Sequence, residues 1–298
     1  MKDNAISENI LFTGLSGWLG RTAERVLTLN LGIKTSQIEY IPSIANGDIK
    51  FRSEEKSYDS FVPLAFPPRD YYWKVSDDEY KSIAKRIIDR DKLILQSNNF
   101  KSVILISSGE VSEKAIRRSP DYKSYRDLKK YQEETLYDIC SHKEVNLSIC
   151  RVYSVTSKEI SNFTSFAFSN FVDLASKNLP IKINNPGLVY RKYLDFGQLF
   201  EVLYKNRKVS KFEMLESSGE LIEIRDLAKI VIETLNSSSI LEHKNSSLEV
   251  ENYFSESSTD YDLYRKYGIQ PFNLKQQIKN VEYALGNNSN TQLTRNKS

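Results

Sequence analysis

Asn9-Ile-Leu-Phe-Thr-Gly-Leu-Ser-Gly-Trp-Leu-Gly20 runs directly into Arg21-Thr-Ala-Glu-Arg-Val-Leu-Thr-Leu29, and this stretch decides the fold. Residues 9–13 form a short apolar run of strand length. From residue 21 onward, the apolar side chains recur at helical spacing. The stretch therefore predicts a strand, a glycine-containing loop and a helix, in that order.

The three glycines of this loop, Gly14, Gly17 and Gly20, suit the binding of a pyrophosphate. Glycine allows a tight turn and lets a ligand approach the backbone. The start of the helix adds backbone N–H groups and the positive end of the helix dipole. The spacing Gly-x-x-Gly-x-x-Gly differs from the commoner Gly-x-Gly-x-x-Gly, and a turn without a ligand is the alternative interpretation. The strand before the loop and the helix after it favour dinucleotide binding.

The first half of the chain continues as an alternation of apolar strands and amphipathic helices. Apolar runs of strand length lie at 38–41, 61–66, 103–106 and 145–152, and helices are expected at 80–95 and 127–140. Such an alternation predicts a doubly wound α/β fold, which is a Rossmann-like parallel sheet covered by helices on both faces.

The second half is less regular and predicts a smaller carboxy-terminal lobe for the substrate. Helices are expected at 163–179, 224–235 and 274–285. We expect a cofactor-binding domain at 1–160 and a substrate lobe at 161–285, with the chain returning to the first domain around 190–235. Residues 286–298 are expected to form a frayed polar tail.

Composition argues against several classes of protein. The chain has 298 residues, of which 40% are apolar, enough for a sizeable core. Its 42 Lys+Arg nearly balance 39 Asp+Glu, which argues against a dedicated nucleic-acid binder. We expect a cytoplasmic protein with no membrane span, because no apolar run is long enough to cross a bilayer, no secretory signal is evident, and Cys140 and Cys150 fit a reducing compartment. No metal site is expected, because neither His142 nor His243 lies in a Cys/His cluster.

Tyr125 and Lys129 form a pattern that suits proton chemistry. They stand four residues apart at the start of a predicted helix, so that both side chains lie on one face. A lysine beside a tyrosine lowers the pKa of the phenol, which suits proton transfer to or from an alcohol or sugar oxygen. A second pair with this spacing, Tyr204 and Lys208, is interpreted as an exposed helix face.

Ser107-Ser108-Gly109-Glu110 follows the expected strand at 103–106. In open parallel sheets, ligands bind at the carboxyl ends of the strands. A serine there could donate a hydrogen bond to a substrate carbonyl, and a plain strand-to-loop turn is the alternative.

The order of these three features resembles the short-chain dehydrogenase/reductase superfamily. The resemblance is to its extended branch, the NAD(P)-dependent nucleotide-sugar epimerases, dehydratases and reductases, and it covers nearly the whole chain. The similar segments are Ile10–Gly20, Val62–Ala65, Ile106–Val111, Tyr125–Glu133, Cys150–Ser154, Arg191–Phe196 and Gly268–Pro271.

The resemblance implies a catalytic triad of Ser108, Tyr125 and Lys129. Tyr125 would give the proton to the sugar oxygen, and Ser108 would donate a hydrogen bond to the same oxygen. Lys129 would lower the Tyr125 pKa and hold the nicotinamide ribose. The implied cofactor contacts are Gly14, Gly17, Trp18, Leu19, Gly20, Ser43, Leu64, Ala65, Ser107, Tyr125 and Lys129. The implied substrate contacts are Glu110, Ser154 and Arg191, the last as a clamp on the nucleotide diphosphate.

The chain also departs from the pattern of this family. Pro63 replaces a histidine, and Ala84 and Ser154 each replace an asparagine. Gly109 stands where the 4,6-dehydratases keep an acid, so dehydration is not expected. The loop from Ser108 to Tyr125 is short for the extended branch, which predicts a trimmed substrate pocket.

The end of the second predicted strand bears on the choice of cofactor. Ser43 and Ile44 follow Pro42 there, and no Asp or Glu is present. A carboxylate at this point would bind an adenosine ribose diol and repel a 2′-phosphate. Its absence favours NADP over NAD, with Arg52 as a partner for the phosphate.

The resemblance implies an NAD(P)-dependent oxidoreductase that acts on a nucleotide-linked sugar, and we expect a 4-keto-sugar reductase of surface polysaccharide biosynthesis. A nucleotide-sugar epimerase that retains its cofactor would use the same triad and is the first alternative. The second alternative is a cofactor-binding regulator or scaffold that has lost turnover. The sequence leaves open the sugar, the nucleotide and the oligomeric state, for which a homodimer is one option.

Overall fold

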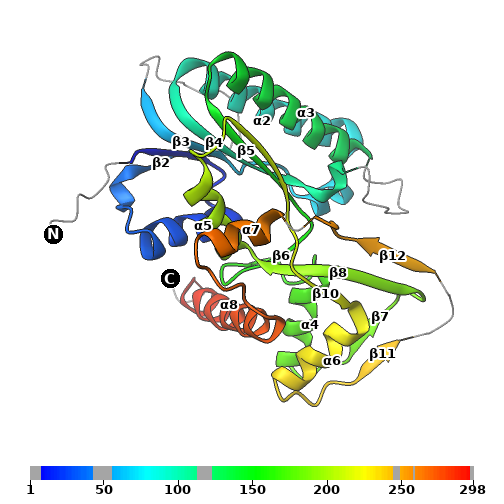
Figure 1. Ribbon diagram of the computed structural model, residues 1–298. Helices are drawn as coiled ribbons and strands as arrows, with labels where there is room; N and C mark the ends of the chain where they lie inside the picture. Colours follow the sequence, from blue (N-terminus) through cyan, green and yellow to red (C-terminus); the bar gives the residue numbers. More distant parts are fainter. Residues whose placement is uncertain (1–7, 43–55, 113–122, 244–248, 258, 296–298) are drawn as a thin grey trace, which may run out of the picture. The chain divides into compact units, whose positions relative to one another are not determined.

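The computed structural model describes residues 8–42, 56–112, 123–243, 249–257 and 259–295 (Figure 1). The chain divides into two compact units. The first contains the described residues of 8–111 and 123–151, and also residues 200–215. The second contains Ser112, residues 152–199 and the described residues from 216 onward.

The first unit is built on a six-stranded sheet with the strand order β2-β1-β3-β4-β5-β9. The strands are β1 (Ile10–Thr13), β2 (Ile38–Ile41), β3 (Ser57–Pro63), β4 (Asn99–Ser108), β5 (Asn146–Val152) and β9 (Phe212–Glu216). β1 pairs in parallel with β2 and with β3, and β3 pairs in parallel with β4. The chain order reverses between β1 and β3, which makes their carboxyl ends the switch point where ligands bind in doubly wound sheets.

Helices cover both faces of this sheet, which confirms the predicted doubly wound α/β fold. α2 (Asp77–Ser97) and α3 (Lys123–His142) lie side by side on one face (Figure 1). α1 (Trp18–Arg25) is continued by η1 (Val26–Asn30) on the other face. The end of α5 (Phe196–Asn206) lies beside η1, because Asn30 donates a hydrogen bond to Glu201 at 2.7 Å.

The long helix α2 shows how the sequence determines where a helix begins and which of its faces is buried. Tyr80, Ala84 and Ile88 recur every four residues and are fully buried. Ser76 caps the helix, because its Oγ accepts a hydrogen bond from the Glu79 backbone N–H at 3.2 Å. Three acidic residues in the first turn, 77–79, complement the positive end of the helix dipole.

The hydrophobic core beneath α2 and α3 fixes which side chains of the strands face these helices. Its buried members are Leu11, Tyr58, Phe61, Ile94, Leu95, Phe100, Val103, Leu105, Leu136, Cys140, Val145, Leu147 and Ile149. Side chains alternate between the two faces of a strand, so Thr13, Ser107 and Arg151 lie on the same face, closer to the carboxyl ends. The core therefore ends in a polar layer at the edge of the sheet where ligands bind.

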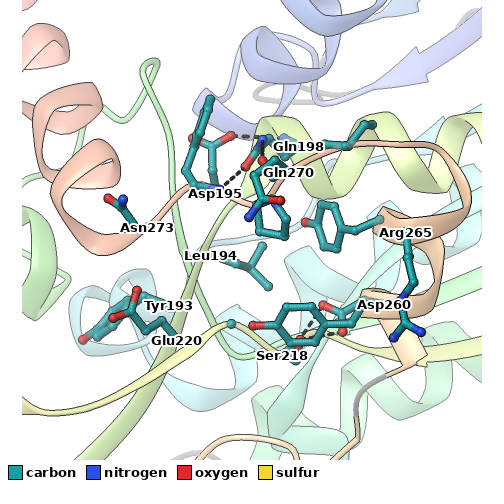
Figure 2. Close-up of a pocket in the computed structure, with 16 residues that line it drawn as sticks. Tyr193, Leu194, Asp195, Gln198, Ser218, Glu220, Asp260, Arg265, Gln270 and Asn273 are labelled. Carbon is teal, nitrogen blue, oxygen red and sulfur yellow. Dashed lines mark hydrogen bonds between the residues drawn. The ribbon is translucent and has the colours of Figure 1, made fainter.

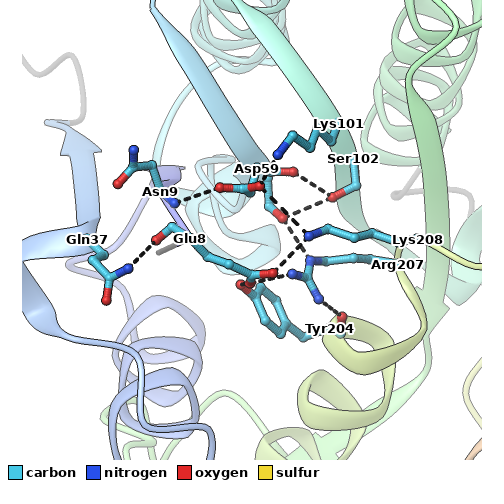
Figure 3. Close-up of polar contacts among 10 residues, drawn as sticks. Glu8, Asn9, Gln37, Asp59, Lys101, Ser102, Tyr204, Arg207 and Lys208 are labelled. Carbon is cyan, nitrogen blue, oxygen red and sulfur yellow. Dashed lines mark hydrogen bonds and ion pairs between the residues drawn. The ribbon is translucent and has the colours of Figure 1, made fainter. Parts of the chain in front are cut away.

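A cluster of charged side chains joins residues 200–215 to the rest of the first unit (Figure 3). Tyr204 and Arg207 both donate hydrogen bonds to the Glu8 carboxylate, and Lys208 Nζ lies 2.8 Å from Glu8 Oε1. Arg207 Nε also donates to Ser60 Oγ on β3 at 2.9 Å. The interpretation of Tyr204 and Lys208 as an exposed helix face is wrong, because Tyr204 is only 3% exposed and both side chains bind Glu8.

The buried Tyr204 hydroxyl makes a prediction about stability. Tyr204→Phe is expected to lower the free energy of unfolding by about 1–2 kcal/mol, because it removes a buried hydrogen bond to a carboxylate. Urea unfolding of the two proteins, followed by circular dichroism, measures this difference. Equal stability would show that the Tyr204 hydroxyl contributes nothing to the cluster.

The second unit has a sheet centred on β8 (Leu188–Asp195). β8 pairs antiparallel with β10 (Glu220–Glu223) and parallel with β12 (Val250–Tyr253) and β6 (Ser154–Thr156). A separate pair joins β7 (Ile181–Ile183) to β11 (Leu241–His243). The helices are α4 (Ala167–Ser176), α6 (Ile224–Thr234), α7 (Thr259–Lys266) and α8 (Leu274–Arg295). α8 extends past its predicted end at 285, to Arg295.

Two further findings concern the described part of the chain. No helix within it combines the length and the apolar character that crossing a membrane requires. No group of three or more His, Cys, Asp or Glu side chains within it is placed to hold a metal ion.

Candidate active site

The glycine loop lies at the carboxyl end of β1, and two of its glycines are required by the packing of the chain. Gly14 has a φ of +76°, and a Cβ there would lie 2.4 Å from the Ala65 backbone nitrogen. A Cβ on Gly20 would lie 2.5 Å from the Gly14 carbonyl oxygen. Leu64 N–H donates to the Thr13 carbonyl at 2.9 Å, so the segment after β3 packs on the loop. The structure thus brings Leu64 and Ala65 to the glycine loop.

Gly17 has a different environment. It is exposed and precedes Trp18 and Leu19, which begin α1 and are partly buried. The nearest described atom to a Cβ on Gly17 would be the Gly14 carbonyl oxygen, at 3.4 Å. Within the described residues no side chain caps α1. The fold itself therefore tolerates a side chain at Gly17, whereas a pyrophosphate bound to the N–H groups at the start of α1 would not.

Phe66 brings the side chains of Tyr125 and Lys129 together. The Tyr125 and Phe66 rings meet edge to face, with centroids 5.8 Å apart. Lys129 Nζ lies 3.9 Å from the centroid of the same Phe66 ring. Tyr125 remains partly exposed, whereas Lys129 is buried. The pair therefore presents one accessible phenol beside one buried ammonium group, as a proton-transfer site requires.

Lys129 is anchored at the carboxyl end of β4. Its Nζ donates to the Ile106 carbonyl oxygen at 3.3 Å and to Gln132 Oε1 at 3.1 Å. Burial lowers the pKa of Lys129 to about 8, and the negative charges of Asp91 and Glu133 oppose this effect. Lys129 therefore changes its charge near neutral pH, where an exposed lysine would remain fully charged.

The lowered pKa of Lys129 predicts a pH dependence of stability. Between its folded pKa of about 8 and its ordinary pKa of 10.5, the unfolded chain binds more protons, so stability rises with pH. The difference in unfolding free energy between the wild type and Lys129→Met is expected to shift by about 2–3 kcal/mol in favour of the wild type across this window. Urea unfolding of both proteins from pH 7 to pH 10 measures the shift. A constant difference would contradict the burial of a titrating lysine.

The two serines at the end of β4 directly follow Ile106, whose carbonyl oxygen accepts a hydrogen bond from Lys129 of α3. Ser108 is buried, and its Oγ accepts a hydrogen bond from the Glu110 backbone N–H at 3.3 Å. Its own hydroxyl proton can be donated to a substrate oxygen. Ser107 and Glu110 are also buried, and within the described residues Ser107 Oγ has no hydrogen-bond partner.

The predicted substrate residues Ser154 and Arg191 belong to the second unit. Ser154 begins β6 and is paired with Tyr193 of β8. Arg191 on β8 forms an ion pair with Glu251 on β12, and its guanidinium lies 5.5 Å from the Tyr253 ring. A diphosphate would have to replace Glu251 to bind Arg191, so its role as a clamp stays a prediction. Ser43 and Arg52 lie outside the described residues.

The second unit also contains a cavity of about 450 Å³, shown in Figure 2. Its polar side chains bond mainly to neighbouring parts of the same unit. Gln198 Nε2 donates to the Gln270 carbonyl at 2.8 Å, and the Phe272 N–H donates to Gln198 Oε1 at 2.8 Å. The Ser218 N–H donates to Asp260 at 2.9 Å. These groups fix the loop before α8 and the start of α7.

No family model and no curated protein sequence matches the chain. Solved structures match it over almost its full length. UDP-N-acetylglucosamine 4-epimerase of Methanobrevibacter ruminantium, in complex with UDP-N-acetylmuramic acid, has a TM-score of 0.73 and 14% identity over 94% of this chain and 99% of that chain. UDP-glucose 4-epimerase of Thermus thermophilus, in complex with NAD, has a TM-score of 0.65 and 15% identity over 93% of this chain and 99% of that chain.

A third similar structure is UDP-glucose-4-epimerase of Stenotrophomonas maltophila with bound NAD and formylated UDP-arabinopyranose. Its TM-score is 0.71, with 13% identity over 95% of this chain and 99% of that chain. The chain therefore has the fold of nucleotide-sugar 4-epimerases, which is the fold that the resemblance implied.

Three residues at the site were not singled out from the sequence. Phe66 was treated only as the end of an apolar run, although it contacts both Tyr125 and Lys129. Gln132 was treated only as part of a predicted helix, although it accepts a hydrogen bond from Lys129. Asp91 was treated only as part of a predicted helix, although its negative charge favours protonation of Lys129.

Proposed function

We propose that the protein is an NAD-dependent epimerase of a nucleotide-linked sugar. The observation that carries the proposal is the joint placement of Tyr125 and buried Lys129 against Phe66, in the unit that bears the glycine loop. Solved nucleotide-sugar 4-epimerases share the fold, and this likeness supports the epimerase alternative more than the 4-keto-sugar reductase that the sequence led us to expect.

The site residues fit a nicotinamide dinucleotide. Gly17 leaves room for a pyrophosphate at the start of α1, and Leu64 and Ala65 lie beside that loop at the switch point of the sheet. Bound NAD supplies the hydride acceptor and the hydride donor. The structures of similar fold from T. thermophilus and S. maltophila contain NAD, which favours NAD over the NADP expected from the missing acid near Ser43.

The proton chemistry is assigned to three side chains. Tyr125 takes the proton of the sugar hydroxyl as the carbon is oxidised, and returns it when the carbon is reduced from the opposite face. The positive charge of Lys129 favours the phenolate form of Tyr125 by lowering its pKa. Ser108 donates a hydrogen bond to the oxygen on which charge develops. The sugar undergoes no net oxidation, because both the hydride and the proton return to it. The epimerised nucleotide-linked sugar would be an activated sugar donor of the kind used in polysaccharide synthesis.

The test is incubation of the purified protein and NAD with UDP-glucose or UDP-N-acetylglucosamine. An epimerase gives a mixture of C4 epimers by proton NMR, with no net change in absorbance at the NADH wavelength. A reductase instead consumes one NADH or NADPH for each 4-keto-sugar reduced. Binding of the cofactor without either reaction, across a panel of nucleotide-linked sugars, would support the regulator or scaffold alternative.

A further inference from the structure

The ammonium group of Lys129 is held by three neighbouring groups of the first unit. An ammonium group has three N–H donors and no acceptor. Its Nζ donates to the Ile106 carbonyl oxygen at 3.3 Å and to Gln132 Oε1 at 3.1 Å, and it lies 3.9 Å from the centroid of the Phe66 ring. Among the described residues, Gln132 is therefore the only side chain that accepts a hydrogen bond from Lys129.

Gln132 reaches Lys129 because the two residues stand three apart on α3, so that their side chains lie on one face of the helix. Gln132 is 0% exposed, and Leu136, one turn further along α3, belongs to the hydrophobic core. Burying an amide costs free energy unless it is hydrogen-bonded. An apolar side chain of the same length would fill this space without that cost, so the packing of α3 alone does not require a glutamine.

The orientation of the Gln132 amide is determined by Lys129. Because an ammonium group only donates, the amide oxygen has to face it and the amide nitrogen has to point elsewhere. Within the described residues, Gln132 Nε2 has no hydrogen-bond partner, although it is buried. A buried donor without a partner lowers stability, whereas the reversed amide would place two donors against each other. The contact with Lys129 is thus made at the expense of the nitrogen of Gln132.

The carboxylates around Lys129 do not replace this contact. The negative charges of Asp91 on α2 and Glu133 on α3 favour the charged form of Lys129. Both carboxylates are engaged by other side chains, Asp91 by Arg90 and Thr13, and Glu133 by Arg151. Their charges therefore act on Lys129 without fixing where its ammonium group lies, and the position of that group depends on its direct contacts.

We propose that Gln132 is a positioning residue for Lys129, whose side-chain oxygen holds the ammonium group in its charged form at the carboxyl end of β4. The inference rests on the proposed function only in that Lys129 serves the site. The alternative is that Gln132 merely fills space between α3 and the sheet. The two roles differ in whether the loss of the amide oxygen changes the protonation of Lys129.

The direct test is the titration of the Lys129 ε-amino group without any added ligand. It is followed by NMR of protein labelled with ¹³C at the lysine ε-carbon, with Lys129→Met to assign the signal. Gln132→Met keeps the length of the side chain and removes the amide oxygen, so the titration midpoint is expected to fall by about one pH unit. Gln132→Glu keeps an acceptor oxygen and adds a negative charge, so the midpoint should rise.

Two outcomes of this titration would overturn the proposal. An unchanged midpoint in Gln132→Met would show that the amide oxygen does not hold the charged form of Lys129. A fall of the midpoint in both variants would indicate that any change at this position disturbs the packing around Lys129.

Gln277→Met is the matched control, because Gln277 is also 0% exposed and lies in the second unit. Its amide accepts a hydrogen bond from Thr156 at 2.9 Å and donates to two backbone carbonyls, at 3.0 Å and 3.3 Å. This variant should leave the Lys129 midpoint unchanged. In urea unfolding it should lose more stability than Gln132→Met, which also removes an unpartnered donor. A Lys129 midpoint that falls equally in Gln277→Met would contradict the proposal.

The pH profile of kcat/KM separates positioning from a purely structural role. The proposed function depends on the positive charge of Lys129. Gln132→Met should therefore retain the wild-type kcat/KM at pH 6, where Lys129 is charged in both proteins, and lose ~10-fold at pH 9. Equal losses at both pH values would contradict the proposal. A wild type that is inactive on every nucleotide-linked sugar would contradict the proposed function instead, and the NMR titration, which needs no ligand, would still decide the role of Gln132.

Discussion

Tyr125→Phe is expected to lower turnover of a nucleotide-linked sugar by ~10²–10⁴-fold, the usual share of general acid–base catalysis. The substitution keeps the ring, so the edge-to-face contact with Phe66 is retained and the fold should be unchanged. It removes the hydroxyl that exchanges a proton with the sugar. The affinity for NAD should change little, because Lys129 and the glycine loop are intact. Initial rates at saturating substrate, with binding measured by calorimetry, test both statements.

Tyr204→Phe is the matched control for this experiment. Tyr204 has a lysine at the same spacing, but its hydroxyl is bound to Glu8 in the buried cluster of Figure 3. It should lose stability and retain its turnover per folded molecule, which is the reverse of the result expected for Tyr125. Similar small losses of turnover in the two variants would place the catalytic proton donor elsewhere.

Gly17→Asp is expected to abolish binding of the dinucleotide while the protein stays folded. Among the described residues, a Cβ at this position would meet only the Gly14 carbonyl, at 3.4 Å, so the fold accepts the side chain. The carboxylate would occupy the space of the pyrophosphate and repel its charge at the start of α1. The chain has 2 tryptophans, one of which is Trp18 beside this loop. In a Trp73→Phe background, quenching of Trp18 fluorescence by NADH therefore reports binding at the loop.

Two alanine variants separate the roles of the glycines. Gly20→Ala should destabilise the fold, because its Cβ would lie 2.5 Å from backbone atoms of Gly14 and Leu15. Gly17→Ala should fold normally and bind NADH more weakly than the wild type. Unchanged affinity in Gly17→Asp would remove the loop from the binding site.

The first unit could be predicted well because its signals are local. β1, the glycine loop and α1 are consecutive, and each long helix has an apolar face of helical period, as Tyr80, Ala84 and Ile88 show. The sheet of the second unit was missed because its strands are short and pair with distant segments. β8 carries partly buried side chains at Tyr190, Arg191 and Lys192, so that no alternation of apolar and polar residues marks it.

Residues that act through long-range contacts also could not be predicted from the sequence. Tyr204 looked like an exposed residue because its partner, Glu8, is separated from it by most of the chain. Asp91 lies inside a predicted helix, and its significance depends on the neighbouring α3, which supplies Lys129. Ser108, Tyr125 and Lys129 could be predicted because their order along the chain resembles that of a known family. Tyr204 and Asp91 are not part of that motif order.

The return of residues 200–215 to the first unit has a consequence for the synthesis of the chain. β9 is the outermost strand beside β5, and its segment follows 152–199 of the other unit. On the ribosome, the first unit therefore cannot close when residue 151 emerges. Until the later segment arrives, β5 presents an open strand edge and Glu8 lacks the cations of Arg207 and Lys208. A nascent chain that stalls before residue 200 would expose this edge to other chains, which makes the interval between the two segments the point at which aggregation competes with folding.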